Sequence, residues 1–223
     1  MRFARWNGLS IVFGLLFLGA LVFQAIAGHA DFNEEQRQHH ASDVSFGRYV
    51  TSAAYAVAVL ENWQSEYLQF ALYVLATVWL IQLGSTESKQ LGKEGGESDE
   101  EQKVGEHADD ESPPSARAGG LRTLLYSNSL FIVMGLIFLG SWAAQSVTGW
   151  VEYSDQRFEH QMDTISWWSY LGSADFWERS LQNWQSEFLA VGSMAILSVY
   201  LRQRGSSQSK PVGSAHHATA EEG

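Results

Sequence analysis

Residues 8–28, GLSIVFGLLFLGALVFQAIAG, and residues 129–149, SLFIVMGLIFLGSWAAQSVTG, decide how this chain folds. Neither stretch contains Lys, Arg, Asp or Glu. A helix rises about 1.5 Å per residue, so about 20 apolar residues span the roughly 30 Å hydrocarbon layer of a bilayer. We therefore predict that both stretches are helices that cross a membrane.

The second stretch lies 121 residues after the first, and more of the sequence recurs at the same offset. Asn62-Trp63-Gln64-Ser65-Glu66 returns letter for letter as Asn183-Trp184-Gln185-Ser186-Glu187. Residues 7–89 align with 128–210 without a gap, which predicts an internal repeat. Further identical pairs are Gly28 with Gly149, His39 with His160, and Tyr49 with Tyr170.

Each copy closes with a second uncharged run, at residues 67–84 and 188–201. The last run is the shortest and contains Ser193 and Ser198, but its counterpart is plainly hydrophobic, so we predict that both runs span. The predicted fold class is all-α, a four-helix transmembrane bundle built from a tandem, parallel two-helix repeat. Its segments are a first membrane repeat (1–84), a linker (85–127), a second membrane repeat (128–205) and a tail (206–223).

Basic residues are unevenly distributed along the chain. Of the 14 Lys and Arg, the inter-helix loops hold only Arg37, Arg48, Arg157 and Arg179. Because basic residues accumulate on the cytoplasmic side, we predict that both termini are cytoplasmic. The alternative for the first run is a cleaved signal peptide, since Ala25-Ile26-Ala27 resembles a cleavage site. Its length and its mid-chain counterpart favour a retained span.

Composition excludes several classes of function. The formal net charge of −11 argues against a nucleic-acid partner, and the lack of cysteine excludes disulfides and thiol chemistry. The linker (85–127) and the tail (206–223) are rich in charged and small residues and poor in large apolar ones. They bury too little surface to offset chain entropy, so we predict that both are disordered.

The external loops, 29–63 and 150–183, begin polar and then turn aromatic. No Gly or Pro interrupts residues 48–83 or 173–191, which predicts one long helix that starts near Ser52 or Ser173 and continues into the membrane. The alternative is a short interfacial helix that breaks near the repeated pentapeptide and is followed by a separate span. Continuity is the favoured interpretation.

Polar side chains of the pentapeptide share one helical face, because they are three and four residues apart. Each first span also has one strongly polar residue near its outer end. Since neighbouring helices are antiparallel, we predict that Gln24 meets the 62–66 face and that Gln145 meets the 183–187 face. The candidate site consists of Gln24, Asn62, Ser65, Glu66, Gln145, Asn183, Ser186 and Glu187.

A carboxylate near the hydrocarbon boundary is costly unless it is hydrogen-bonded or hydrated. In the functional interpretation, Glu66 and Glu187 bind protons or cations at the outer mouth of the bundle. In the favoured structural interpretation, each Glu caps a helix N-terminus and each Gln joins two helices. Close helix approach is predicted at four glycines: Gly14, Gly19, Gly135 and Gly140.

No pattern predicts catalysis. The sequence has no Ser/His/Asp arrangement, phosphate-binding loop or nucleotide-binding fingerprint that rises above chance. We therefore predict no enzyme and no cofactor. One loop cluster matches no zinc spacing, and a solvated acidic surface is favoured over a metal site. Its members are His29, Asp31, Glu34, Glu35, His39 and His40.

The Gly-Leu-x-Phe-Leu-Gly block at 14–19 and 135–140, with the repeated pentapeptide, resembles small bacterial membrane proteins known only as a domain of unknown function. The resemblance implies a location in the bacterial cell (inner) membrane and no activity. We expect a structural protein, or one that binds lipids or a protein partner. The expected partners are the bilayer and a membrane or envelope protein, and a homo-oligomer is possible. The alternative is a small transporter or channel that uses Glu66 and Glu187, which the uncharged span interiors disfavour.

Overall fold

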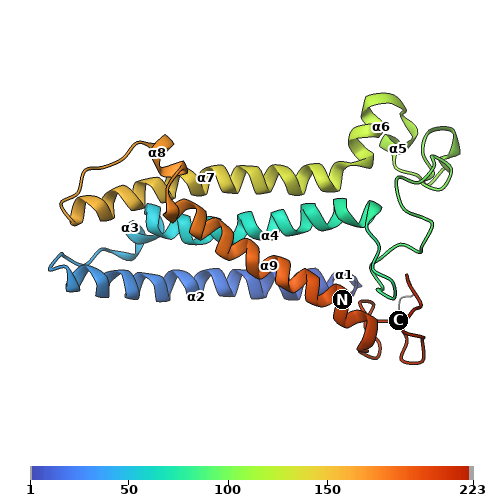
Figure 1. Ribbon diagram of the computed structural model, residues 1–223, viewed down its shortest axis with the longest axis horizontal. Coiled ribbons are helices and arrows are strands. Elements are labelled where there is room, and N and C mark those ends of the chain that lie inside the picture. Colours follow the sequence, from blue (N-terminus) through green and yellow to red (C-terminus); the bar gives the residue numbers. More distant parts are fainter. Residues whose placement is uncertain (1, 221–223) are drawn as a thin grey trace. The chain divides into compact units, whose positions relative to one another are not determined.

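The computed structural model describes residues 2–220 and is all-helical there (Figure 1). The predicted N-terminal and C-terminal segments include Met1 and 221–223, which lie outside the described residues. The elements are α1 (Arg2–Trp6), α2 (Gly8–Gln38), α3 (Phe46–Val50), α4 (Ala53–Trp79), the 3-10 helix η1 (Gly105–His107), α5 (Pro114–Arg117), α6 (Gly120–Ser127), α7 (Ser129–Glu159), α8 (Trp167–Leu171) and α9 (Ala174–Tyr200).

The element bounds follow the sequence offset. Helices α7, α8 and α9 begin and end 121 residues after α2, α3 and α4. The turns that follow α2 and α7 also agree, since His40 and Gln161 both adopt positive φ, at 58° and 57°. Equivalent sequence therefore forms equivalent local structure in the two copies.

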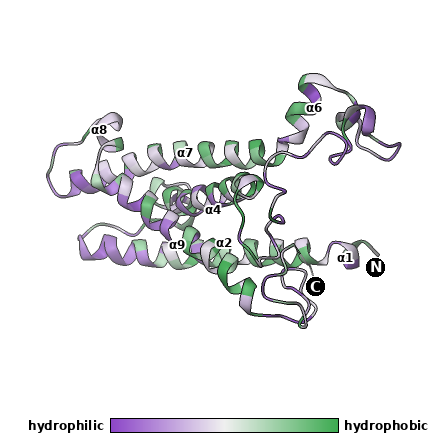
Figure 2. Cartoon of the chain, turned by 45° about the vertical axis from the view of Figure 1, so that its right-hand side comes forward, coloured by the Kyte–Doolittle hydropathy of each residue, from purple (hydrophilic) through white to green (hydrophobic). Residues whose placement is uncertain are grey.

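Helices α2 and α7 are long and apolar enough to cross a membrane. Only 6% of the most apolar window of α2 and 17% of that of α7 is buried within the protein. Both helices continue beyond the apolar runs into residues that we assigned to loops, to Gln38 and Glu159. Residues 29–38 contain no Gly or Pro and several good helix formers, so nothing in the sequence stops the helix there. Figure 2 shows this hydrophilic end on α2 and α7.

Helices α4 and α9 confirm the predicted continuity through the pentapeptide. Each is capped at the predicted serine: the Ser52 hydroxyl accepts from the Tyr55 N–H at 3.3 Å, and the Ser173 hydroxyl accepts from the Phe176 N–H at 3.3 Å. Helix α4 ends at Trp79, so residues 80–84 of the apolar run are not helical.

The chain divides into two compact units. The first contains the residues up to Leu60 together with Ala144–Tyr170, and the second contains Glu61–Ala143 together with the residues from Leu171 onward. Each unit therefore holds parts of both sequence copies, whereas the predicted boundaries follow the copies themselves.

In the first unit, two tyrosines occupy the space above two helical glycines. Tyr49 and Tyr170 are 6% and 1% exposed. A Cβ on Gly28 would lie 2.2 Å from the Tyr49 hydroxyl oxygen, and a Cβ on Gly149 would lie 2.5 Å from that of Tyr170. Burial raises the pKa of the Tyr49 phenol above its ordinary value. The recurrence of this Gly–Tyr pair in the sequence thus has a packing cause.

The loop after each long helix is held by a side chain of that helix. The His29 Nε2–H donates to the Val44 carbonyl at 2.6 Å, and Asn33 bonds both the carbonyl and the N–H of Val44. At the equivalent place in the second copy, the Trp150 indole N–H donates to the Ile165 carbonyl at 2.7 Å. His29 is therefore engaged in loop packing.

Within its own unit, none of Gly14, Gly19, Gly135 and Gly140 shows the close helix approach that we predict there. A Cβ added at any of these four positions would meet no described atom within 4 Å. A glycine permits another part of the chain to come close to its helix but does not bring it there. Close packing also needs a side chain that fills the space above the glycine. Gly28 and Gly149 have such a partner.

The segments after α4 and α9 fold back over the helix ends with one repeated pattern, Gly-Ser-x-x-Ser-Lys, at 84–89 and 205–210. Ser88 and Ser209 each accept a backbone N–H six residues earlier, at 2.9 Å. The Gly95 N–H then donates to the Val78 carbonyl at 2.7 Å, and His216 Nδ1 lies 3.1 Å from the Val199 carbonyl oxygen. These bonds satisfy terminal helix carbonyls. Disorder of the remaining linker and tail stays a prediction.

We predict that Gly28→Ala and Gly149→Ala each lower the free energy of unfolding by about 1–3 kcal/mol, because the new methyl group overlaps a buried tyrosine hydroxyl. Thermal or denaturant unfolding in detergent measures the effect. Gly19→Ala and Gly140→Ala are matched controls with open space at the Cβ, and they should change little. Adding Tyr49→Phe to Gly28→Ala should recover part of the loss. Equal effects at all four glycines would contradict the packing cause.

Candidate functional site

The two pentapeptides meet within the second unit, where α4 lies against α9. The Trp184 indole N–H donates to the Gln64 side-chain oxygen at 2.7 Å. Gln64 is 0% exposed, so the acceptor of this bond is shielded from solvent. The contact joins the third residue of the first pentapeptide to the second residue of the other.

Two further side-chain contacts join α4 and α9 near this bond. The Ser65 hydroxyl, which is buried, donates to Glu187 Oε1 at a long 3.5 Å. Arg179 Nη1 lies 3.0 Å from Glu61 Oε1, and Arg179 Nε also pairs with Asp175 at 3.1 Å. The buried polar groups at this place therefore connect the two copies.

Trp184 also takes part in an aromatic cluster that reaches α7. Its ring centroid lies 5.7 Å from that of Trp142 and 6.4 Å from that of Phe138. Trp142 stacks on Phe176 at 5.8 Å, and its N–H donates to the buried Ser180 hydroxyl at 3.1 Å. The first copy has Leu21 at the position equivalent to Trp142, so this cluster is particular to the second copy.

Six of the predicted site residues lie in the second unit, and most bond locally. Asn183 donates to the Arg179 carbonyl at 2.8 Å, and Ser186 donates to the Asn183 carbonyl at 2.8 Å. Glu66 is exposed and lies close enough to Glu187 for their carboxylates to interact electrostatically. Ser65 and Glu187 are thus brought together across the copies, while Asn183 and Ser186 bond their own helix. Asn62 is exposed.

The other two predicted residues, Gln24 and Gln145, lie in the first unit. Gln24 is exposed, whereas Gln145 is 1% exposed and neither polar atom of its amide has a hydrogen-bond partner among the described residues. The predicted pairings of Gln24 with residues 62–66 and of Gln145 with residues 183–187 join residues of different units. They stay predictions.

Sequence reasoning missed Gln64, the most deeply buried residue of the pentapeptide. Helical spacing grouped Asn62, Ser65 and Glu66, and Gln64 lay beside that face. The signal that could have found it is the exact recurrence of Gln64 as Gln185 beside a tryptophan. Glu61 and Arg179 have no such signal, because their equivalents are Gln182 and Ala58.

The loop cluster that we considered for a metal has other contacts. Arg37 pairs with Glu34 at 3.7 Å and with Asp43 at 3.4 Å. The rings of His39 and His160, which are equivalent in the repeat, lie 6.1 Å apart between centroids. Within residues 2–220, no three His, Asp or Glu side chains converge as metal ligands.

We predict that Trp184→Phe lowers the free energy of unfolding by about 1–3 kcal/mol, because the buried Gln64 oxygen loses its donor. Gln64→Leu combined with Trp184→Phe should be less damaging than the sum of the two single changes. A double-mutant cycle, read by unfolding of the full chain, measures this coupling. Gln185→Leu is the matched control at the exposed equivalent position and should have little effect. If the free-energy changes of the two single variants simply add, the Trp184–Gln64 hydrogen bond does not couple α4 to α9.

Comparison with known proteins gives a family and no activity. The family model described as Domain of unknown function (DUF6766) matches residues 1–221. No match was found among curated proteins or among solved structures. Because the match covers nearly the whole chain, the protein belongs to the DUF6766 family.

Proposed function

We propose that this chain is a four-span membrane protein that serves a structural or partner-binding role in the bacterial inner membrane, with both termini in the cytoplasm. The observation that carries the proposal is the exposed apolar surface of α2 and α7. In α2, Phe13, Leu15 and Leu16 are 63%, 65% and 62% exposed. Soluble proteins rarely expose a contiguous apolar surface of this kind, whereas lipid chains cover it without cost.

Helices α4 and α9 supply the return spans in this proposal. Each follows one of the long apolar helices after a short helix, and each continues the duplicated order of elements. Arg202, just after α9, donates to the Ser198 and Val199 carbonyls at 3.2 and 3.1 Å. A cation at a helix C-terminus is favourable, and here it supports a cytoplasmic end.

A structural role fits the use of the polar groups. Gln64 and Ser65 bond residues of the other copy, and Glu61 is paired with Arg179. These contacts stabilise the association of the two copies and leave few polar groups free for chemistry. The proposed partners are lipids and another membrane or envelope protein, including a second copy of this chain.

A small transporter or channel is the second candidate, and one observation favours it. Glu66 and Glu187 lie near each other in the second unit, and Glu66 is exposed. Two like charges at the outer ends of spans would attract cations. The uncharged interiors of the apolar runs favour the structural role, because ion paths usually place ionisable groups deeper.

We predict that single cysteines at residue 100, in the linker, and at residue 215, in the tail, react with a membrane-impermeant maleimide only after cells are permeabilised. The chain has no native cysteine, so no background must be removed. A cysteine at residue 41 or 162, in the inter-helix loops, should react in intact cells. Labelling of linker and loop from the same side would contradict four spans.

We predict that Glu66→Gln combined with Glu187→Gln leaves the fold and cation flux into proteoliposomes unchanged, as the structural role requires. Flux through the wild-type chain that the double variant abolishes, while its elution and unfolding stay normal, would replace the structural role with transport. Asp155→Asn, at an exposed position near the C-terminal end of α7, is the control for a lost surface charge.

A further inference from the structure

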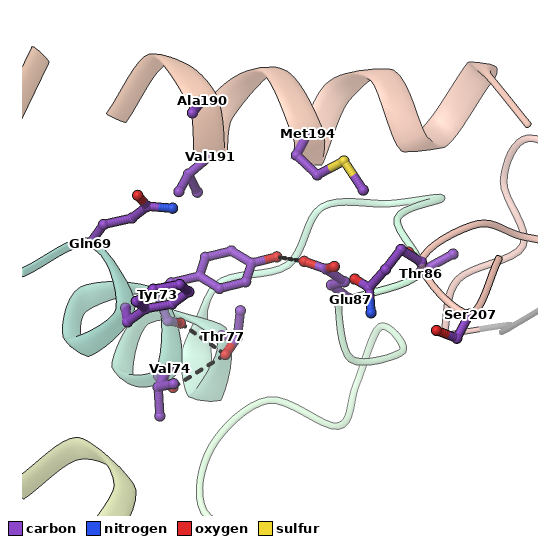
Figure 3. Close-up of a pocket in the computed structure, with 12 residues that line it drawn as sticks. Gln69, Tyr73, Val74, Thr77, Thr86, Glu87, Ala190, Val191, Met194 and Ser207 are labelled. Carbon is purple, nitrogen blue, oxygen red and sulfur yellow. Dashed lines mark hydrogen bonds between the residues drawn. The ribbon is translucent and has the colours of Figure 1, made fainter. Parts of the chain in front are cut away.

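A cavity of about 600 Å³ lies within the second unit (Figure 3). This volume is within the range of small-molecule sites. Its walls come from α4, α9 and the two segments that carry the repeated Gly-Ser-x-x-Ser-Lys pattern. The lining residues that matter here are Gln69, Tyr73, Thr86, Glu87, Val191 and Met194.

The cavity is lined by equivalent positions of the two copies. At the offset of 121, Tyr73 corresponds to Met194, and Glu87 corresponds to Gln208. Further pairs in the lining are Gln69 with Ala190, Phe70 with Val191, and Thr86 with Ser207. The first copy has the more polar or charged residue at three of these pairs: Tyr73 against Met194, Glu87 against Gln208 and Gln69 against Ala190. One side of the cavity is therefore acidic and hydrogen-bonding, and the other is mainly apolar.

The acidic side is built around Glu87. Its Oε2 accepts from the Tyr73 hydroxyl at 2.5 Å, and its N–H donates to the Ser85 hydroxyl at 3.3 Å, which fixes the side chain and its backbone. Among the lining residues none is Lys, Arg or His. The nearby Lys89 pairs instead with Glu97 at 3.0 Å and donates to the Gly95 carbonyl at 2.9 Å. The Glu87 charge is thus not neutralised by the described residues.

Thr86 gives a second, independent sign of a ligand. Thr86 lines the cavity and is 7% exposed, yet its hydroxyl has no hydrogen-bond partner among the described residues. A buried hydroxyl without a partner costs free energy, about 1–3 kcal/mol. A hydrogen-bonding group beside Glu87 would remove that cost.

We propose that this cavity binds an amphipathic cation, with its ammonium group between Glu87 and Thr86 and its apolar body against Val191 and Met194. The ammonium group would donate to the carboxylate, and a rotation of the Thr86 side chain would turn its hydroxyl toward the same group. Phe70 and Tyr73 add aromatic faces, which attract cations. Anionic ligands are excluded, because the lining offers a carboxylate and no cation. This site goes beyond the proposed structural role and does not depend on the number of membrane spans.

Equilibrium dialysis of labelled decylammonium against the full chain in neutral maltoside micelles tests the site. Decanol, which is uncharged, and decanoate, which is negatively charged, have the same number of carbon atoms and serve as matched probes. We expect saturable binding of decylammonium alone, weakened roughly tenfold or more by Glu87→Gln and several-fold by Thr86→Val. Glu87→Asp keeps the charge and should retain most of the binding.

The matched control is Glu94→Gln, which removes an exposed linker carboxylate outside the cavity and should leave the affinity unchanged. Decanol binding as tightly as decylammonium, or full affinity in Glu87→Gln, would overturn the proposal and leave an apolar pocket for lipid chains. Elution volume and tryptophan fluorescence check that each variant is folded. Thr86→Val, which nearly preserves shape, decides the question if Glu87→Gln fails to fold.

Discussion

The hydrogen bond from Trp184 to Gln64 is the contact on which the second unit depends. It joins the fully buried Gln64 side chain of α4 to Trp184 of α9, while the Trp184 ring reaches Trp142 and Phe138 of α7. One side chain therefore fixes the placement of three helices that come from both copies. Such a bond also sets the register of the two helices, because a slip would leave the buried Gln64 oxygen without its donor.

The sequence carries enough information for the helices but not for their partners. Ser52 and Ser173 predict the starts of α4 and α9 because capping is a local property, and the offset of 121 predicts the equivalence of elements. The ends of α2 and α7 were missed because the apolar run stops before the helix does. The roles of Gln64 and Gly28 were not predicted for a different reason. Each depends on contact with a side chain far away in the sequence, Trp184 or Tyr49, which local spacing does not identify.

The two copies keep the same backbone and differ in what their side chains do. Gly28 with Tyr49 and Gly149 with Tyr170 preserve the same packing. Trp142 replaces Leu21 and adds an aromatic cluster, while Glu87 and Tyr73 line the same cavity as their equivalents Gln208 and Met194. The shared pairs thus keep the same packing, while these differences change an aromatic cluster and the lining of one cavity.

The Gly-Ser-x-x-Ser-Lys segments have a consequence for how the chain tolerates change. The last helix of each copy ends against a segment that follows it in the chain. Gly95 hydrogen-bonds the Val78 carbonyl of α4, and His216 hydrogen-bonds the Val199 carbonyl of α9. The described side-chain bonds of residues 98–112 are all made within the linker. The middle of the linker therefore acts as a tether, and changes in its length or charge should leave the hydrogen-bonded ends of α4 and α9 intact.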